Sequence, residues 1–291
     1  MISNDLIKLT VKELLKTAST EIPKDVKDAL MMAYVNEEKE IPKIQLKAML
    51  ENIDLASKMS VPICQDTGIP IIYVTLGNVE IDDIETAIKS AVEEATKSVP
   101  LRPNIVHPIT RMNPGTNIGV HMPYINYKFS RKKCIEITVM PKGAGSENMS
   151  AFINLTPADG LKGVKEFILN SVVEAGGKSC PPNILGIGIG GSADISMRLA
   201  KEALLRPLNE KNPDPTIAQL ETEIFEVMNG IGIGPMGLGG KSTLLGVNIE
   251  YAYCHTGSLP VAVNFQCWPA RRATARIFDD GKIEYLSHME S

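Results

Sequence analysis

Three cysteines stand in similar surroundings, each with proline or glycine close by. Their segments are VPICQDTG around Cys64, GGKSCPPN around Cys180 and NFQCWPARR around Cys267. Proline and glycine predict turns, from which a thiolate can project inward. The separations, 116 residues from 64 to 180 and 87 from 180 to 267, are too long for a zinc knuckle or a ferredoxin run. Spacing alone leaves open whether the three are metal ligands or small buried side chains, as free cysteines commonly are.

A set of three thiolates would have a specific chemical use. A [4Fe–4S] cluster held by three cysteines leaves one iron free for a substrate hydroxyl and carboxylate, as an open metal site requires. That iron would act as a Lewis acid for loss or addition of water, without a redox change. The remaining two cysteines fit the other interpretation. Cys134 lies in an alternating strand pattern and Cys254 in an apolar, aromatic run, so we expect both to be buried.

Polar residues close to these cysteines suit a dicarboxylate. Gln65 and Asp66 follow Cys64 directly. Arginines are further candidates, because a guanidinium group can bind a carboxylate through two hydrogen bonds. The four considered are Arg102, Arg111, Arg271 and Arg272. Each could instead form a structural ion pair, and the adjacent pair could brace the loop after Cys267.

Two further segments offer groups for an anionic substrate. The stretch Gly143–Asn148 is predicted to be an irregular loop whose amides bind an oxyanion, with a plain surface turn as the alternative. His255, in the sequence CHTGSLP, could hydrogen-bond a substrate carboxylate or have a structural role.

Glycine-rich motifs resemble nucleotide sites but lack the required context. Gly186–Gly191 and Gly232–Gly237 satisfy G-x-G-x-x-G, but a dinucleotide site also needs a second strand that ends in an acidic residue, and we find no convincing one. Gly239–Ser242 resembles the end of a P-loop, yet the required earlier glycine falls at Pro235. A nucleotide-dependent dehydrogenase stays an alternative that NAD binding would reveal.

Composition limits the class of protein. A formal net charge of −4 over 291 residues argues against a nucleic-acid or anionic-membrane surface, which needs a basic face. The N-terminus lacks the pattern of a signal peptide, and no apolar run reaches the roughly 18 residues that span a bilayer. We therefore expect a cytoplasmic protein with reduced thiols and without disulfides.

Helices and mainly antiparallel strands must position these residues. Apolar residues recur at helical spacing over the first 60 residues, and further helices are predicted over 82–99, 159–175, 193–205 and 215–228. Alternation predicts two strands within 117–140 around a basic turn, and more strands within 244–286, the last two joined at Asp280-Gly281. We expect an α+β fold with one catalytic region over 1–291, comprising a helical part (1–60) and an α/β part (61–291).

Five motifs in order, ICQDTG, GAGSEN, SCPPN with GIGIGG, HTGSLP and CWPARR, resemble the alpha region of iron–sulfur (class I) fumarases and L-tartrate dehydratases. The resemblance covers essentially the whole chain. It implies that an oxygen-sensitive [4Fe–4S] cluster is bound by Cys64, Cys180 and Cys267. It implies substrate-binding roles for Gln65, Asp66, Arg102, Gly145 and His255. Asp66 and His255 would also be catalytic, and Arg111 is the alternative to Arg102.

Fused members of that family carry a second region with the main catalytic base. This chain ends at Ser291, so the resemblance implies the alpha subunit of a split enzyme, with a beta subunit as partner and an alpha–alpha dimer within an α2β2 assembly. The implied reaction is reversible hydration of fumarate to (S)-malate, and dehydration of L-tartrate to oxaloacetate is the nearest alternative. A non-catalytic iron–sulfur or zinc-binding scaffold is a further alternative, which metal content would distinguish.

Overall fold

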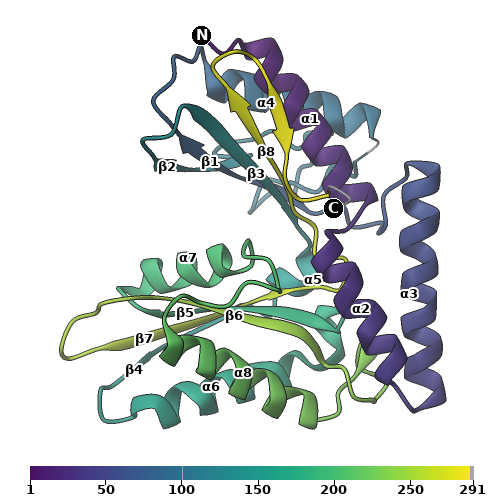
Figure 1. Cartoon of the computed structure of the whole chain (residues 1–291), viewed down its shortest axis with the longest axis vertical. Coiled ribbons are helices and arrows are strands. Elements are labelled where there is room, and N and C mark those ends of the chain that lie inside the picture. Colours follow the sequence, from purple (N-terminus) through teal and green to yellow (C-terminus); the bar gives the residue numbers. More distant parts are fainter. Residues whose placement is uncertain (100, 289–291) are drawn as a thin grey trace. The chain divides into compact units, whose positions relative to one another are not determined.

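Figure 1 shows the computed structural model of the chain, which describes residues 1–99 and 101–288. Two compact units alternate along the sequence. The first combines Met1–Lys24, Glu51–Gly143 and Arg271–Ser291, and the second combines Asp25–Leu50 and Ala144–Ala270. Each unit pairs a sheet with helices, which confirms the predicted α+β class. That the whole chain acts as one catalytic region stays a prediction.

The sheet of the first unit has five strands in the order β2-β1-β3-β8-β9. β1 pairs parallel with β2 and antiparallel with β3, and the remaining pairs are antiparallel. The basic turn joins β2 to β3, and Asp280-Gly281 joins β8 to β9, as predicted. The strands are β1 (Ile69–Leu76), β2 (Tyr124–Phe129), β3 (Cys134–Lys142), β8 (Ala273–Phe278) and β9 (Ile283–Tyr285).

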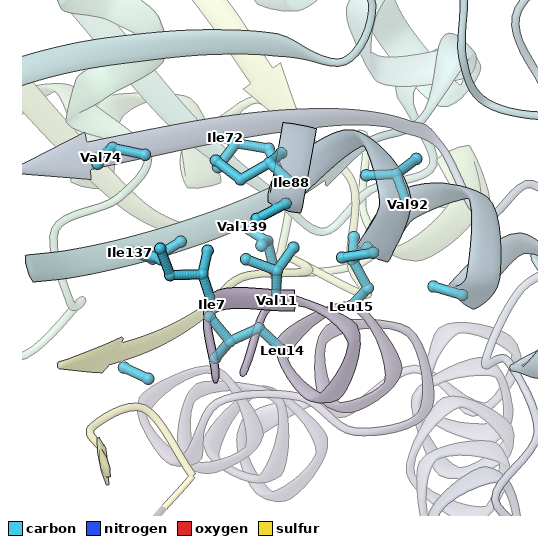
Figure 2. Close-up of a cluster of buried hydrophobic side chains, with 14 of the residues drawn as sticks. Ile7, Val11, Leu14, Leu15, Ile72, Val74, Ile88, Val92, Ile137 and Val139 are labelled. Atoms are coloured by element: carbon cyan, nitrogen blue, oxygen red, sulfur yellow. The ribbon is translucent and has the colours of Figure 1, made fainter. Parts of the chain in front are cut away.

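Two helices, α1 (Asn4–Thr20) and α4 (Ile84–Ser98), pack on this sheet through one apolar cluster. Ser3 caps the start of α1 and Asp83 that of α4, because their side chains accept backbone N–H groups of the first turn. Buried residues three or four positions apart give each helix one apolar stripe. Side chains of both helices meet those of β1 and β3 in Figure 2, which labels Ile7, Val11, Leu14, Leu15, Ile88, Val92, Ile72, Val74, Ile137 and Val139.

The sheet of the second unit has four strands in the order β4-β7-β5-β6. β5 pairs parallel with β6 and antiparallel with β7, and β7 pairs antiparallel with β4. Pairing in both sheets is thus mainly antiparallel, as the sequence predicts. The strands are β4 (Ala151–Leu155), β5 (Asn183–Gly190), β6 (Leu244–Ala252) and β7 (Leu259–Gln266).

Helices cover both faces of this second sheet (Figure 1). α6 and α8 bury an apolar cluster against one face, and α7 packs against the other. No helix in the described ranges is long and apolar enough to cross a membrane. The helices on this sheet are α6 (Gly160–Ala175), α7 (Ala193–Ala203) and α8 (Pro215–Gly230). The remaining helices are α2 (Lys24–Asn36), α3 (Glu40–Met59), α5 (Ala144–Glu147), η1 (Gly176–Ser179) and η2 (Pro235–Gly237).

The P-loop-like segment Gly239–Ser242 is held against the turn between α2 and α3. The backbone N–H of Lys241 donates to Glu37 Oε2 (2.8 Å), and Lys241 Nζ lies 2.6 Å from Glu38 Oε1. A Cβ on Gly240 would lie 2.4 Å from Glu37 Oε2, so this close approach requires glycine. A carboxylate therefore engages the lysine that a P-loop would direct at phosphate.

Three glycines of the motif Gly186–Gly191 lie inside β5, and two of them let α7 approach the sheet. A Cβ on Gly188 would lie 2.0 Å from the carbonyl oxygen of Ser196, and one on Gly186 would lie 2.0 Å from that of Ala200. These two positions therefore serve helix–sheet packing.

We expect Gly188→Ala to lower the free energy of unfolding by about 2–3 kcal/mol, because the added methyl group forces α7 away from β5. Urea denaturation followed by circular dichroism measures the change. Gly230→Ala, at the end of α8, is the matched control, because no heavy atom lies within 4 Å of its Cβ position. The control should be neutral or stabilising by up to about 1 kcal/mol. Equal stability of the Gly188→Ala and wild-type proteins would contradict this packing.

Candidate functional site

Cys64 lies in the loop between α3 and β1, in the first unit, and is partly exposed. Both backbone groups of the preceding residue, Ile63, are hydrogen-bonded. The Ile63 N–H donates to the Ser19 carbonyl (2.9 Å), and the Asn52 side chain donates to the Ile63 carbonyl (2.9 Å). Cys64 therefore follows a fixed point of the chain, in the kind of loop that its flanking proline and glycine predict.

Asp66 braces the loop that follows Cys64. Its Oδ1 accepts hydrogen bonds from the Gly68 N–H (2.9 Å) and from Asn104 Nδ2 (3.1 Å). Its carbonyl oxygen accepts a hydrogen bond from Arg271 Nη1. Gln65, by contrast, is exposed. Of the two predicted substrate residues beside Cys64, Gln65 is therefore exposed to solvent. Asp66 has a structural role in the loop, whether or not it also binds substrate.

Arg102 is an exposed residue whose backbone is tied to the Cys64 loop. Its N–H donates to Thr67 Oγ1 (3.0 Å), and its carbonyl accepts from Asn117 Nδ2 (3.1 Å). Arg111 is also exposed, but it belongs to a separate turn in which its N–H donates to the His107 carbonyl (2.9 Å). These contacts place the Arg102 backbone beside the candidate ligand loop, and its role in binding a carboxylate stays a prediction.

Arg271 and Arg272 are buried, with 2% and 5% of their surface exposed. Arg271 donates to the Asp66 carbonyl, and its Nη2 lies 2.8 Å from where a Cβ on Gly143 would stand. The alternative in which this pair braces a loop therefore fits Arg271 better than direct carboxylate binding. A side chain at Gly143 would therefore have to displace the guanidinium group of Arg271.

Cys180 and Cys267 lie in adjacent turns of the second unit. The N–H of Trp268, which follows Cys267, donates to the Cys180 carbonyl (3.2 Å). Cys180 has φ 56° and ψ 64°, a left-handed conformation that is uncommon for residues other than glycine. Cys267 is 8% exposed. Cys180 precedes the start of β5 and Cys267 follows the end of β7, so antiparallel pairing of these strands brings the two turns to one edge of the sheet.

Asn183 clamps these two turns together, and sequence reasoning gave it no role. Its Nδ2 donates to the Ser179 carbonyl (2.9 Å) and the Gln266 carbonyl (3.1 Å), and its Oδ1 accepts from Ser179 Oγ (2.7 Å). Ser179 and Gln266 each directly precede a predicted ligand. The SCPPN motif contains this asparagine, which is the only signal that the sequence offers for it.

Gly145 lies on α5, one helical turn within the predicted loop, rather than in fully irregular chain. A Cβ on Gly145 would lie 3.3 Å from the Lys178 carbonyl, two residues before Cys180. Glu147 fixes the end of this turn, because its Oε1 pairs with Lys201 Nζ (2.6 Å) and its Oε2 accepts from Asn264 Nδ2 (3.3 Å). Gly145 is exposed and adjoins the Cys180 turn, as a substrate-approach loop requires.

His255 lies at the opposite end of the second sheet from Cys180 and Cys267. It belongs to the exposed loop before β7, and its Nδ1 accepts the Gly257 N–H (3.0 Å). Eight strand residues at about 3.4 Å each place that loop roughly 25 Å from the Cys267 turn. The structure thus does not bring His255 together with the two cysteines of its own unit, and its substrate and catalytic roles stay predictions.

The two remaining cysteines differ in their exposure to solvent. Cys134 is buried on β3, as predicted. The prediction for Cys254 is wrong, because this residue is exposed, with its Sγ 3.2 Å from the Ser258 carbonyl. The apolar run before it ends β6, and Cys254 lies just beyond, in the connection to β7.

The three predicted ligands are divided between the two units, with Cys64 in the first and Cys180 and Cys267 in the second. Within residues 1–99 and 101–288, no group of three histidine, cysteine, aspartate or glutamate side chains could hold one ion. A cluster makes a different demand, because each thiolate binds a different iron. None of the five cysteines, all of which lie in the described residues, forms a disulfide, and Cys64, Cys180 and Cys267 each lie in a loop or turn braced by hydrogen bonds. Thiolates are the donors that an iron–sulfur cluster takes, and that these three cysteines bind one cluster stays a prediction.

Comparison with known proteins gives a consistent result. The sequence pattern of the family described as fumarate hydratase (Fumerase) matches residues 8–276. The chain is 52% identical over 279 residues to a Methanocaldococcus jannaschii protein provisionally named L(+)-tartrate dehydratase subunit alpha, covering 94% of this chain and 98% of that one. It is 35% identical over 276 residues to L(+)-tartrate dehydratase subunit alpha of Escherichia coli strain K12, covering 94% and 91%. The Shigella boydii protein of that name matches equally well.

Proposed function

Because this chain belongs to the fumarate hydratase family of hydro-lyases, we propose that it is the cluster-binding alpha subunit of a two-subunit hydro-lyase. Cys64, Cys180 and Cys267 would hold a [4Fe–4S] cluster, and a separate beta subunit would complete the active site. The observation that carries the proposal is the arrangement around Cys180, where the Cys267 turn and the Gly145 turn meet at one edge of the second sheet. Names of the relatives as alpha subunits support the beta partner.

The substrate would be a small dicarboxylate or hydroxy-dicarboxylate. We propose reversible hydration of fumarate to (S)-malate as the reaction, which the family description supports. Dehydration of L(+)-tartrate is the second candidate, because the relatives carry that name. The two substrates differ by hydroxyl groups, and the groups that distinguish them would lie partly on the beta subunit. An alpha–alpha dimer within an α2β2 assembly and a cytoplasmic location, where thiols stay reduced, complete the proposal.

The residues of this chain would bind and orient the substrate. The bound cluster would supply an open Lewis-acidic iron, which stabilises the hydroxide that is lost or gained. Arg102, exposed beside the Cys64 loop, would bind a substrate carboxylate through its guanidinium fork. The Gly145 amide would donate to the charge that develops on the carboxylate as the neighbouring carbon loses its proton. Gln65 would orient the substrate, and the main base would come from the beta subunit.

Anaerobic coexpression with the beta subunit tests this function. We expect the reconstituted complex to convert malate, fumarate or L(+)-tartrate, and the isolated chain to have little activity, because half of the site is missing. A ratio of kcat/KM values of at least about 100 for one substrate would identify it, since loss of a buried hydrogen bond discriminates by that much or more. A complex with a full cluster but no activity on all three would contradict the proposal.

A further inference from the structure

Asn104 is a partly buried residue with a side chain directed at the Cys64 loop. Its Nδ2 lies 3.1 Å from Asp66 Oδ1, 3.0 Å from the Gly68 carbonyl and 3.5 Å from Thr67 Oγ1. These three acceptors are consecutive in the sequence, two to four residues after Cys64. One amide group therefore holds the whole segment that follows the candidate ligand.

The side chain of Asn117 connects the backbones of Asn104 and Arg102 to α4. It is 1% exposed, and its Oδ1 accepts the Asn104 N–H (2.9 Å). Its Nδ2 donates to the Arg102 carbonyl (3.1 Å) and to Thr96 Oγ1 at the end of α4 (3.1 Å). A buried amide that loses a partner is left unsatisfied at a cost of about 1–3 kcal/mol, so we expect these hydrogen bonds to stay formed.

Thr67 closes the network. Its side chain is buried, and its Oγ1 accepts the Arg102 N–H at 3.0 Å. The segment 102–104 is therefore joined to the segment 66–68 by backbone and side-chain contacts, all within the first unit. Neither segment belongs to a helix or strand, so these hydrogen bonds set their relative position.

We propose that Asn104 is a positioning residue that fixes the carboxylate-binding Arg102 relative to the ligand loop of Cys64. This inference rests on the proposed function for the roles of Arg102 and Cys64. An amide is the side chain that the site requires, because its –NH2 group donates to a carboxylate and to a carbonyl at once. An aspartate of the same shape would face Asp66 Oδ1 and the Gly68 carbonyl with a third acceptor.

Amide hydrogen exchange of the full chain tests the positioning directly. We expect Asn104→Asp, which keeps the shape, and Asn104→Leu to speed exchange at the Gly68 and Arg102 amides by about tenfold, the equivalent of one net hydrogen bond. The urea unfolding midpoint should change little, because the core clusters are untouched. Asn113→Leu is the matched control. Asn113 is exposed and donates to the Pro103 carbonyl (2.8 Å), so it contacts the same segment but not the Cys64 loop.

Kinetics of the reconstituted complex provide the second readout. Both Asn104 variants should raise KM for the dicarboxylate by about 10- to 100-fold, the usual effect of losing a supporting contact, while kcat stays within about threefold. Asn113→Leu should leave both constants unchanged. Equal exchange rates and equal KM values for Asn104→Asp and wild type would overturn the inference. An inactive wild-type complex would instead overturn the proposed function, and the exchange result would still decide whether Asn104 holds the loop.

Discussion

Replacing Cys267 with serine is expected to abolish hydro-lyase activity of the reconstituted alpha–beta complex. Serine is close in size to cysteine, so the half-buried turn shared with Cys180 should persist. The lost thiolate leaves the cluster one ligand short, and iron is then lost. Lewis-acid stabilisation contributes several kcal/mol, and about 4 kcal/mol corresponds to about 1,000-fold in rate. Anaerobic initial-rate assays with the substrate of the wild-type complex measure the loss, and Cys64→Ser and Cys180→Ser should behave alike.

Cys254→Ser is the control for this experiment. Cys254 is an exposed free thiol in the connection between β6 and β7, at the end of the sheet opposite to Cys267. Its substitution should leave activity and iron content unchanged. If Cys267→Ser retained activity together with a complete cluster, Cys267 would not be a ligand and the assignment of the site would fail.

The second large effect is expected from Arg271→Met. Arg271 is 2% exposed and donates to the Asp66 carbonyl, so methionine would fill much of the space but leave that partly buried acceptor without this donor. We expect a loss of about 2–4 kcal/mol in the free energy of unfolding, measured by urea denaturation. Arg271 follows Cys267 by four residues and braces the loop of Cys64, so iron retention after gel filtration should also fall.

Arg198→Met is the matched control for Arg271→Met. The Arg198 side chain on α7 is 62% exposed, and its Nε lies 3.7 Å from Glu202 Oε1. An exposed pair of this kind contributes less than about 1 kcal/mol, so the control should be close to wild type. Stability and iron retention of Arg271→Met that match the control would show that the guanidinium group does not brace the loop.

Helix periodicity and turn chemistry predicted much of the fold. The capped helices α1 and α4, the helices α6 to α8, and the hairpin at Asp280-Gly281 lie close to the ranges read from the sequence. β1 was not predicted, because five of its eight residues are buried and the alternation that identifies a strand is absent. The full length of β5 was not predicted either, because its glycines, which accommodate α7, have low strand propensity.

The interleaving of the two units could not be read from the sequence. The first unit draws on three separate stretches of chain, and the second on two. Periodicity reports only which face of a local element is buried, so it does not show that β8 joins the sheet begun by β1 and β3.

The candidate site was predicted only where short motifs carry it. The three cysteines and Gly145 stand in such motifs, whereas Asn104 and Asn183 act through hydrogen bonds to residues 36 to 83 positions away. Amide side chains of this kind have no periodicity or spacing that would distinguish them from surface asparagines. His255 shows the opposite case, because its motif is clear but the strand between it and Cys267 separates them within this chain.

Iron and acid-labile sulfide content of the anaerobically reconstituted chain tests whether Cys64, Cys180 and Cys267 hold a [4Fe–4S] cluster. We predict about four iron atoms and about four sulfides per chain. Each of Cys64→Ser, Cys180→Ser and Cys267→Ser should lower this content, and Cys254→Ser should not. A wild-type chain that takes up zinc alone, or that holds a complete cluster without these three cysteines, would contradict the ligand assignment.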